Sequence, residues 1–261
     1  MKESEKQNQY IMRNPKVITF TVPNALEQSN ARKIDSNNQT SKPSKEQILD
    51  KAFNLHLEGN TKAAIKYYKY CIDNNFNNPK VFMNYGIILK DLGKLKEAEI
   101  AQRKAIELKP DFPYGYTSLG MILLRLDKFN EAEQSFRKSI RMNPNDLTAN
   151  LNLGVVLNYL GKFEESEIYM RKSIKIKSDY PESYNNLSKT LKVLGKLNDA
   201  KRFLLQAIKL KPNYADAVFN LSLIQMLQGD YKSGLKNYES RFKKKKKVKP
   251  HAQPKIPRWF G

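Results

Sequence analysis

Residues 116–120 read Tyr-Thr-Ser-Leu-Gly, and 34 positions later residues 150–154 read Asn-Leu-Asn-Leu-Gly. The final glycine of this frame has a counterpart one period earlier at Gly86, and the series continues as serine at Ser188 and Ser222. A fixed period of this length is typical of stacked repeats, in which each unit contacts only its neighbours. The sequence therefore predicts a repeat array and not a single globular core.

Apolar residues recur at helical spacing throughout the array, as Phe82, Tyr85 and Leu89 show on one predicted helix. This periodicity predicts six helical hairpins between residues 45 and 242. The first helices are expected near 45–58, 79–92, 113–126, 147–160, 181–194 and 215–228. The second helices are expected near 62–75, 95–108, 129–142, 163–176, 197–210 and 231–244.

Helix boundaries are marked by residues with special backbone preferences. Ser44, followed by Gln47, predicts the capping box that opens the first helix. Between paired helices, Asp127 stands where other hairpins have glycine, and both residue types tolerate the left-handed conformation that ends a helix. The glycines at this position are Gly93, Gly161, Gly195 and Gly229.

The formal net charge of the chain is +21, and much of it lies outside the repeats. Residues 1–44 are polar and contain few apolar residues, so we predict a disordered N-terminal arm. Within this arm, residues 16–23 (KVITFTVP) are β-prone and compatible with a short docking strand. Residues 243–261 are predicted to form a basic, proline-containing tail, which leaves residues 45–242 for the repeats.

The run Lys243–Lys247 offers two interpretations, a solvated linker or a site for phosphates. No aromatic residues alternate with the lysines to stack on bases, so nucleic-acid binding is not expected. A single cysteine, Cys71, excludes an internal disulfide and fits a reducing compartment. No apolar run is long enough to span a bilayer, so a cytoplasmic protein without a membrane span is expected.

Evidence for catalysis is sparse in the sequence. The two histidines, His56 and His251, have no cysteine or carboxylate cluster at metal-ligand spacing. Cys71 falls at a packed position of a second helix, where a buried, inert thiol is the expected state. No nucleotide-binding or metal-binding motif is present. We therefore expect no enzyme activity, no cofactor and no metal.

The residues of the third hairpin carry a family resemblance. Tyr116, Leu119, Gly120, Ala132 and Phe136 match an aromatic, Leu-Gly, Ala and Phe pattern with a 34-residue period. This pattern resembles the tetratricopeptide repeat, and the resemblance covers about residues 45–242. It implies an all-α, right-handed solenoid of about six hairpins, whose first helices line a concave groove that binds protein or peptide segments. The expected function is a protein-binding scaffold.

An asparagine ladder stands two residues before each position of the glycine and serine series. It consists of Asn84, Ser118, Asn152, Asn186 and Asn220. An asparagine side chain both donates and accepts, so it can bracket a peptide backbone. The ladder resembles one in the O-linked N-acetylglucosamine transferase family, where it holds substrate backbones; the alternative is that it satisfies backbone groups between repeats.

Basic and aromatic residues accompany the ladder on the face that the resemblance turns inward. The candidate groove residues of this kind are Lys80, Arg125, Tyr159, Lys189 and Lys192. Together with the apolar residues of the same face, they favour a ligand that is both acidic and apolar; the alternative is that they are ordinary variable surface positions.

The C-terminal region suggests an alternative function. Residues 229–231 (GDY), 238–242 (YESRF) and 259–261 (WFG) resemble a junction that precedes a glycosyltransferase-like domain in bacterial tetratricopeptide proteins. No catalytic domain follows in this sequence, so the alternative is the substrate-recognition part of a truncated or split glycosyltransferase. The last predicted helix should also leave an apolar edge uncovered, which predicts self-association through that end of the solenoid.

Overall fold

The computed structural model describes residues 43–240, and every regular element in that part is a helix. The chain forms two compact units, residues 1–76 and residues 77–261. Unit 1 contains α2 (Lys45–Leu57) and α3 (Thr61–Asp73). Unit 2 contains α4 (Pro79–Asp91), α5 (Leu95–Leu108), α6 (Pro113–Arg125), α7 (Phe129–Met142), α8 (Leu147–Tyr159), α9 (Phe163–Ile176), α10 (Pro181–Val193), α11 (Leu197–Leu210), α12 (Ala215–Leu227) and α13 (Tyr231–Tyr238).

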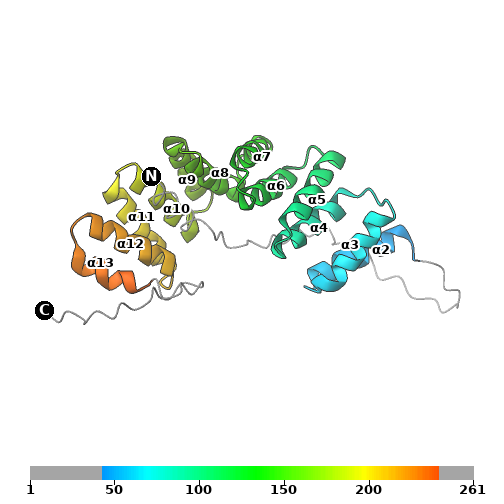
Figure 1. The fold of residues 1–261 in the computed structure, drawn as a ribbon, viewed down its shortest axis with the longest axis horizontal. Coiled ribbons are helices and arrows are strands. Elements are labelled where there is room, and N and C mark those ends of the chain that lie inside the picture. Colours follow the sequence, from blue (N-terminus) through cyan, green and yellow to red (C-terminus); the bar gives the residue numbers. More distant parts are fainter. Residues whose placement is uncertain (1–42, 241–261) are drawn as a thin grey trace, which may run out of the picture. The chain divides into compact units, whose positions relative to one another are not determined.

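These twelve helices pair into the six predicted hairpins, and within each unit consecutive helices form the main contacts (Figure 1). The five first helices of unit 2 begin at residues 79, 113, 147, 181 and 215, as the sequence predicts. The last helix, α13, ends at Tyr238, whereas the predicted helix continued to 244. A tight 3₁₀ turn follows at residues 239–240, a common way for a helix to end. The tail and most of the N-terminal arm lie outside the described residues.

The predicted helix boundaries have the expected backbone chemistry. At α2, the Ser44 hydroxyl accepts from the Gln47 backbone N–H (3.2 Å), and the Gln47 side chain accepts from the Ser44 N–H (2.8 Å). This confirms the capping box. Asp127 has a φ of 59°, which confirms that it replaces glycine at a left-handed position. The equivalent glycines also have positive φ, namely Gly93, Gly161, Gly195 and Gly229.

Each hairpin closes around a small residue that faces a large one. The small-residue seam of unit 2 consists of Gly86, Gly120, Gly154, Ser188 and Ser222. A Cβ atom placed on Gly120 would lie 2.7 Å from Phe136, and one on Gly154 would lie 2.6 Å from Met170. Phe136 and Met170 are fully buried, so neither ring nor thioether has space to move away. The seam is therefore a packing requirement of the fold.

The large partners of the seam follow the same period as the seam itself. They stand at Gln102, Phe136, Met170 and Leu204, all without exposed surface. Apolar residues from the next first helix complete each layer, as Ala149 and Leu153 of α8 do beside Phe136. In unit 2 one buried cluster is formed by α6, α7 and α8 and another by α9, α10, α11 and α12, and the partly buried Val155 packs against both. In unit 1, Ala52, Ala64 and Tyr68 form the equivalent buried centre.

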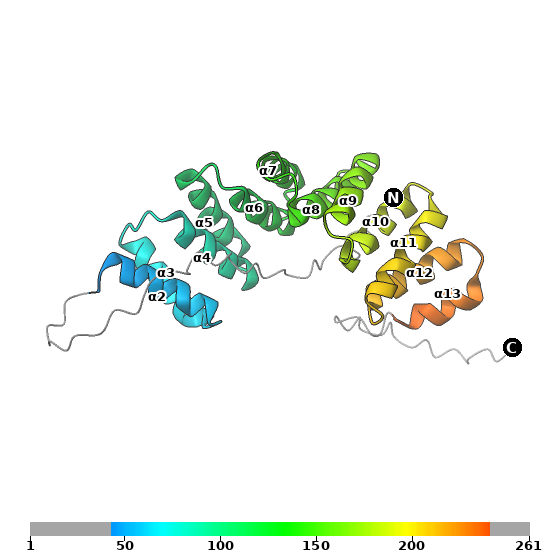
Figure 2. The same ribbon diagram turned by 180° about the vertical axis from the view of Figure 1, so that it is seen from behind.

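Within unit 2, the first helices lie on the inner side. Each of α4, α6, α8 and α10 contacts the next first helix along the chain. The second helices reach one another through long charged side chains, as Arg103 of α5 reaches Glu131 of α7. Figures 1 and 2 show α7 and α9 on the side of unit 2 opposite to α10. The surface of α4, α6, α8, α10 and α12 that faces away from the second helices is called the inner face below.

An ion-pair series joins the second helices. Glu133 accepts from Arg137 (2.8 Å) on its own helix and from Lys162 (2.9 Å) at the start of the next hairpin's second helix. Glu99 and Glu167 occupy the same position in the neighbouring hairpins and make the same two kinds of ion pair. Because each glutamate side chain is largely buried, these pairs tie adjacent hairpins together and fix their register.

Candidate functional site

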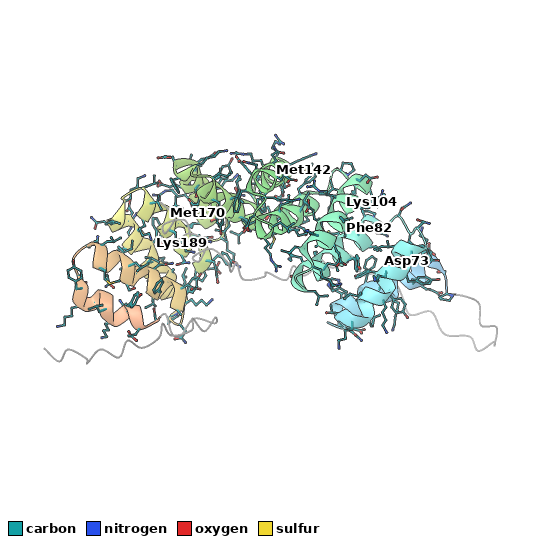
Figure 3. All side chains as sticks on the ribbon, in the orientation of Figure 1. Asp73, Phe82, Lys104, Met142, Met170 and Lys189 are labelled. Atoms are coloured by element: carbon teal, nitrogen blue, oxygen red, sulfur yellow. The ribbon has the colours of Figure 1, made fainter. Side chains whose placement is uncertain are left out.

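The inner face of unit 2 is built from positions that repeat every 34 residues. Equivalent residues of neighbouring first helices lie side by side because those helices contact one another. Figure 3 places Lys189 of α10 on the opposite side of unit 2 from Met142 of α7, which is the expected separation of inner and outer surfaces. The candidate site residues can therefore be compared row by row.

The asparagine ladder lies along the inner face but is largely occupied by contacts within the protein. The Asn152 side chain donates to the Thr148 carbonyl of its own helix (2.9 Å). The Asn220 side chain donates to the side-chain oxygen of Asn185 (2.8 Å), which joins α12 to α10. Asn152 and Asn220 are 6% and 9% exposed, so only a small part of each is accessible to a ligand. The structure thus gives both residues an internal hydrogen-bonding role.

The remaining members of the ladder differ from one another. Asn84 is buried at 7% exposure, and Asn186 is half-buried and accepts from the Lys189 ammonium (3.1 Å). The hydroxyl oxygen of Ser118 is buried and has no hydrogen-bond partner. An unsatisfied buried hydroxyl is unfavourable by about 1–3 kcal/mol. The ladder is therefore interrupted at Ser118 in its hydrogen bonding as well as in its sequence.

Two lysines interrupt an otherwise apolar row on α10. The position of Lys189 is apolar in the other four first helices of unit 2, where it is Ile87, Met121, Val155 and Leu223. Lys192 lies one turn further along the same helix and is half-buried. Burial lowers the pKa of the Lys192 ammonium, and no carboxylate lies within ion-pair distance of it among residues 43–240. A partly desolvated cation without a counter-charge is suited to receive an anionic group.

The other candidate residues take different roles. Lys80 is exposed at the first turn of α4. Arg125 donates to the backbone carbonyl of Lys90 (2.6 Å) and so connects α6 to the end of α4. The Tyr159 ring stacks on Phe129, with 4.4 Å between centroids and 12° between planes. Arg125 and Tyr159 therefore hold neighbouring hairpins together, a role that their residue types did not indicate.

A polar cluster between α10 and α12 was not predicted. Lys211 lies 3.3 Å from Glu182 and 4.7 Å from the ring centroid of Tyr214. Asn185 donates to the Tyr214 hydroxyl at 3.4 Å. Burial first, and then the nearby Glu182 carboxylate, raise the pKa of Tyr214, so this phenol stays protonated. The only signal in the sequence is that Tyr180 and Phe112 are aromatic at the position equivalent to Tyr214.

Catalytic chemistry has little support in the described part of the chain. No group of three or more metal-ligating side chains occurs within residues 43–240. Cys71 is buried, and burial raises the pKa of its thiol, which opposes formation of a nucleophilic thiolate. Over the same residues, no helix combines the length and apolar character needed to cross a membrane.

Apolar side chains are exposed on the last two described helices. Leu227, Tyr231 and Leu235, from α12 and α13, are 59–64% exposed. Self-association through this surface stays a prediction. The lysine run and the residues Trp259-Phe260-Gly261 of the transferase-like junction lie outside the described residues.

Models of one repeat family match the chain, and two of the matched stretches, 79–112 and 181–214, each begin where a hairpin begins. Residues 117–181 match one tetratricopeptide repeat model, and residues 79–112 and 181–214 match another. Together these stretches cover about half of the chain, and each is a tetratricopeptide repeat. No curated protein matches the sequence. The matched models give no support to the glycosyltransferase alternative.

Solved structures show the same fold at low sequence identity. YrrB, described as a TPR protein with an unusual peptide-binding site, is 19% identical with a TM-score of 0.55, over 67% of this chain and 91% of that chain. PilW, a type IV pilus biogenesis factor, is 21% identical with a TM-score of 0.67, over 75% of this chain and 90% of that one. A tetratricopeptide repeat protein from Parabacteroides merdae is 16% identical with a TM-score of 0.66, over 76% and 78%. These matches confirm the predicted all-α, right-handed solenoid.

Proposed function

Because the chain belongs to the tetratricopeptide repeat proteins, we propose that it is a scaffold whose inner face holds a protein segment with apolar residues and a carboxylate. The observation that carries this proposal is the pair Lys189 and Lys192 on α10. Lys192 keeps a half-buried ammonium group without a carboxylate partner among the described residues. An acidic side chain of a ligand would supply the missing charge in a place where water screens it only in part.

The apolar part of the ligand would lie over the neighbouring first helices. Met83, Met121 and Leu151 are buried in the free chain at 7–8% exposure, so only their edges are accessible. Ile87 and Val155 are half-buried in the same region. Contact with an apolar side chain would remove this remaining surface from water, at about 25 cal/mol for each Å². The peptide-binding site named for YrrB is consistent with such a use of this fold.

Selection of peptides from a displayed random library tests the proposal directly. We expect the selected peptides to combine acidic and apolar residues. Fluorescence anisotropy should then show at least about tenfold weaker binding of such a peptide to the Lys189→Met/Lys192→Met variant, because a charged hydrogen bond is typically worth about 1.5–3 kcal/mol. Methionine keeps the unbranched shape of lysine, so the fold should keep its thermal stability.

The matched control is Lys96→Met, which removes an exposed lysine from α5 on the outer side of unit 2. It should bind the same peptide as the parent chain does. Selection of peptides without acidic residues, or equal binding by the double variant, would reject the role given to the two lysines.

Self-association through α12 and α13 is a separate part of the proposal. Leu235 is 59% exposed beside Tyr231, and such an apolar surface at the end of a stack favours association. Sedimentation velocity should show a larger species at high protein concentration, and Leu235→Lys should remove it. The matched change Leu205→Lys, at an exposed leucine of α11, should leave the species in place. A monomer at all concentrations would reject this part alone.

A further inference from the structure

Two rows of cations run across the second helices of unit 2 at the 34-residue period. The first row is Lys104, Lys138 and Lys172, and the second is Arg141, Lys175 and Lys209. On α7 and on α9 the two rows are one helical turn apart, so each helix presents two cations on one face. Figure 3 labels Lys104 on α5 and Met142 at the end of α7.

Apart from Lys104, the cations of these two rows form no ion pair within residues 43–240, unlike nearby cations. Arg103, Arg137 and Arg171 stand one residue before the first row, and each bonds a glutamate of the ion-pair series. In contrast, Lys172 and Lys175 have no ion pair within residues 43–240, and neither has Arg141 or Lys209. Lys104 pairs with Glu107, and Lys138 lies 4.6 Å from the Tyr116 ring centroid.

The helix dipole explains only part of this arrangement. Arg141, Lys175 and Lys209 lie in the last turn of their helices, where a cation is favoured by a few tenths of a kcal/mol to about 1 kcal/mol. Like charges one turn apart oppose that gain by a similar amount. Lys138 and Lys172 lie before the last turn and gain less from the dipole. The glutamates of α7 and α9 lie in the first half of each helix, so these cations gather in the second half, where they are suited to an anionic partner.

Exposed apolar side chains lie among the same cations. Ile168 is 64% exposed and precedes Lys172 and Lys175 by four and seven positions, so the three share one face of α9. Ser166, Met170 and Ser173 are the buried residues of that helix, which places the Ile168 face outward. On α7, Met142 is 41% exposed beside Arg141.

We propose that the outer face of α7 and α9 binds an anionic lipid surface. Lysine and arginine near such a surface are attracted by its negative potential, and Ile168 and Met142 would enter the layer between the headgroups. α7 and α9 occupy the middle of the outer side of unit 2, the part of a convex surface that first meets a flat one. The inner face would then point away from the lipid and stay open to a protein ligand.

A nucleic acid fits these observations less well. Phosphate backbones would match the cations, but single strands also need aromatic side chains for base stacking. The exposed large apolar residues of α7 and α9 are aliphatic, namely Met142 and Ile168. Aliphatic side chains between cations are the combination that an acyl-chain boundary accepts.

Vesicle co-sedimentation of the full chain tests the proposal. We expect binding to vesicles that contain phosphatidylcholine and phosphatidylserine, little binding to phosphatidylcholine alone, and loss of binding as salt is raised. The variant Lys138→Gln/Arg141→Gln/Lys172→Gln/Lys175→Gln should lower the partition coefficient by about tenfold or more, given the attraction of each basic residue to the surface. Ile168→Ser should weaken it by a smaller factor.

Two matched controls separate this face from general charge. Lys51→Gln/Lys62→Gln/Lys66→Gln/Lys69→Gln removes the same charge from exposed lysines of α2 and α3 and should leave vesicle binding unchanged. Val193→Ser, at a 51% exposed residue of α10, is the control for Ile168→Ser. Circular dichroism should show the same melting temperature for all four variants.

Three outcomes would overturn the proposal. The first is vesicle binding that is abolished by glutamine at Lys243–Lys247 and unaffected by the outer-face variant, because the tail would then be the anchor. The second is no vesicle binding together with retention of a short RNA that the outer-face variant releases. The third is equal loss in the outer-face variant and its charge-matched control, since this would indicate net charge alone.

Discussion

The small-residue seam and the asparagine ladder lie two residues apart on the same five helices, yet they recur for different reasons. At Gly120, a Cβ atom would lie 2.7 Å from the buried Phe136 ring, so the backbone of α6 needs a residue without a side chain. At Asn152, the side chain bonds the Thr148 carbonyl of its own helix and makes no comparable demand on a neighbour. The first recurrence is required by packing between helices, and the second is not.

The difference is visible in the partner that each series has. The three glycines of the seam each face a large residue 16 positions later, as Gly120 faces Phe136 and Gly154 faces Met170. The ladder has no complementary series, and its members bond to different kinds of group. A residue that recurs every 34 positions therefore identifies a repeat. A second set of residues with the same period, at a fixed distance from the first, identifies a packing contact between the helices.

The largest expected effect comes from filling the seam. Gly120→Val should destabilise the chain by about 2–3 kcal/mol, because extra carbon atoms in a full core force shifts of the neighbouring side chains. Urea unfolding followed by circular dichroism would measure this loss. Phe136→Leu in the same chain should restore part of the stability, since it removes the ring that the new side chain meets.

Gly161→Asn provides the matched control for the seam substitution. Gly161 has a φ of 75° and open space around the position of a Cβ atom, and asparagine tolerates this conformation. Its cost should stay below about 1 kcal/mol. Equal losses at Gly161 and Gly120 would contradict the packing explanation of the seam.

The ion-pair series should produce the second largest effect, and its size should depend on pH. Burial of Glu133 tends to raise its pKa, but the hydrogen bonds from Arg137 and Lys162 outweigh burial, so the pKa is lowered in the folded chain. A carboxyl group with a lowered folded pKa contributes stability that is present above its unfolded pKa, near 4.5, and is lost as the pH falls through the folded pKa.

Glu133→Gln should therefore lower the free energy of unfolding by about 1–2 kcal/mol at pH 7, and by little in acid where the parent carboxyl is protonated. Glu97→Gln is the control, because the Glu97 side chain is 54% exposed and its pair with Lys94 is solvated. That change should cost less than about 0.5 kcal/mol at either pH. Chemical denaturation across the acid range would compare them.

Features of the fold that depend on neighbours along the chain were predicted well. The capping box at Ser44 and the left-handed Asp127 follow from local backbone preferences, and both are confirmed. The seam follows from the period and from the requirement that two helices approach closely. These features need no knowledge of where distant side chains point.

The candidate site was harder to predict, because its side chains choose partners across hairpins. The charge of Arg125 suggested ligand binding, but its guanidinium donates a hydrogen bond to the Lys90 carbonyl at the end of α4 (2.6 Å). Tyr159 similarly finds the Phe129 ring on the preceding helix. The polar cluster at Tyr214 joins residues 29 positions apart that no motif links. Such contacts depend on interhelical geometry, which the period does not specify.

The smallest expected effects distinguish members of the asparagine ladder. Asn220→Ala leaves the Asn185 oxygen without its donor, and because Asn185 is only 2% exposed, this should cost about 1 kcal/mol. Asn152→Ala removes only a bond to a carbonyl of its own helix, and the better helix propensity of alanine should offset that loss to within about 0.5 kcal/mol.

Thermal unfolding of the two single variants would rank them, and binding of a selected peptide would show which asparagine also contacts a ligand. If a variant keeps its thermal stability but binds the peptide more weakly, the replaced asparagine contacts the ligand. If stability and affinity fall together, the asparagine stabilises the packing of the repeats. We expect Asn152 to be of the first kind and Asn220 of the second, because only Asn220 bonds a side chain of another hairpin. The reverse ranking would mean that Asn152 of α8 stabilises the fold and that Asn220 of α12 contacts the ligand.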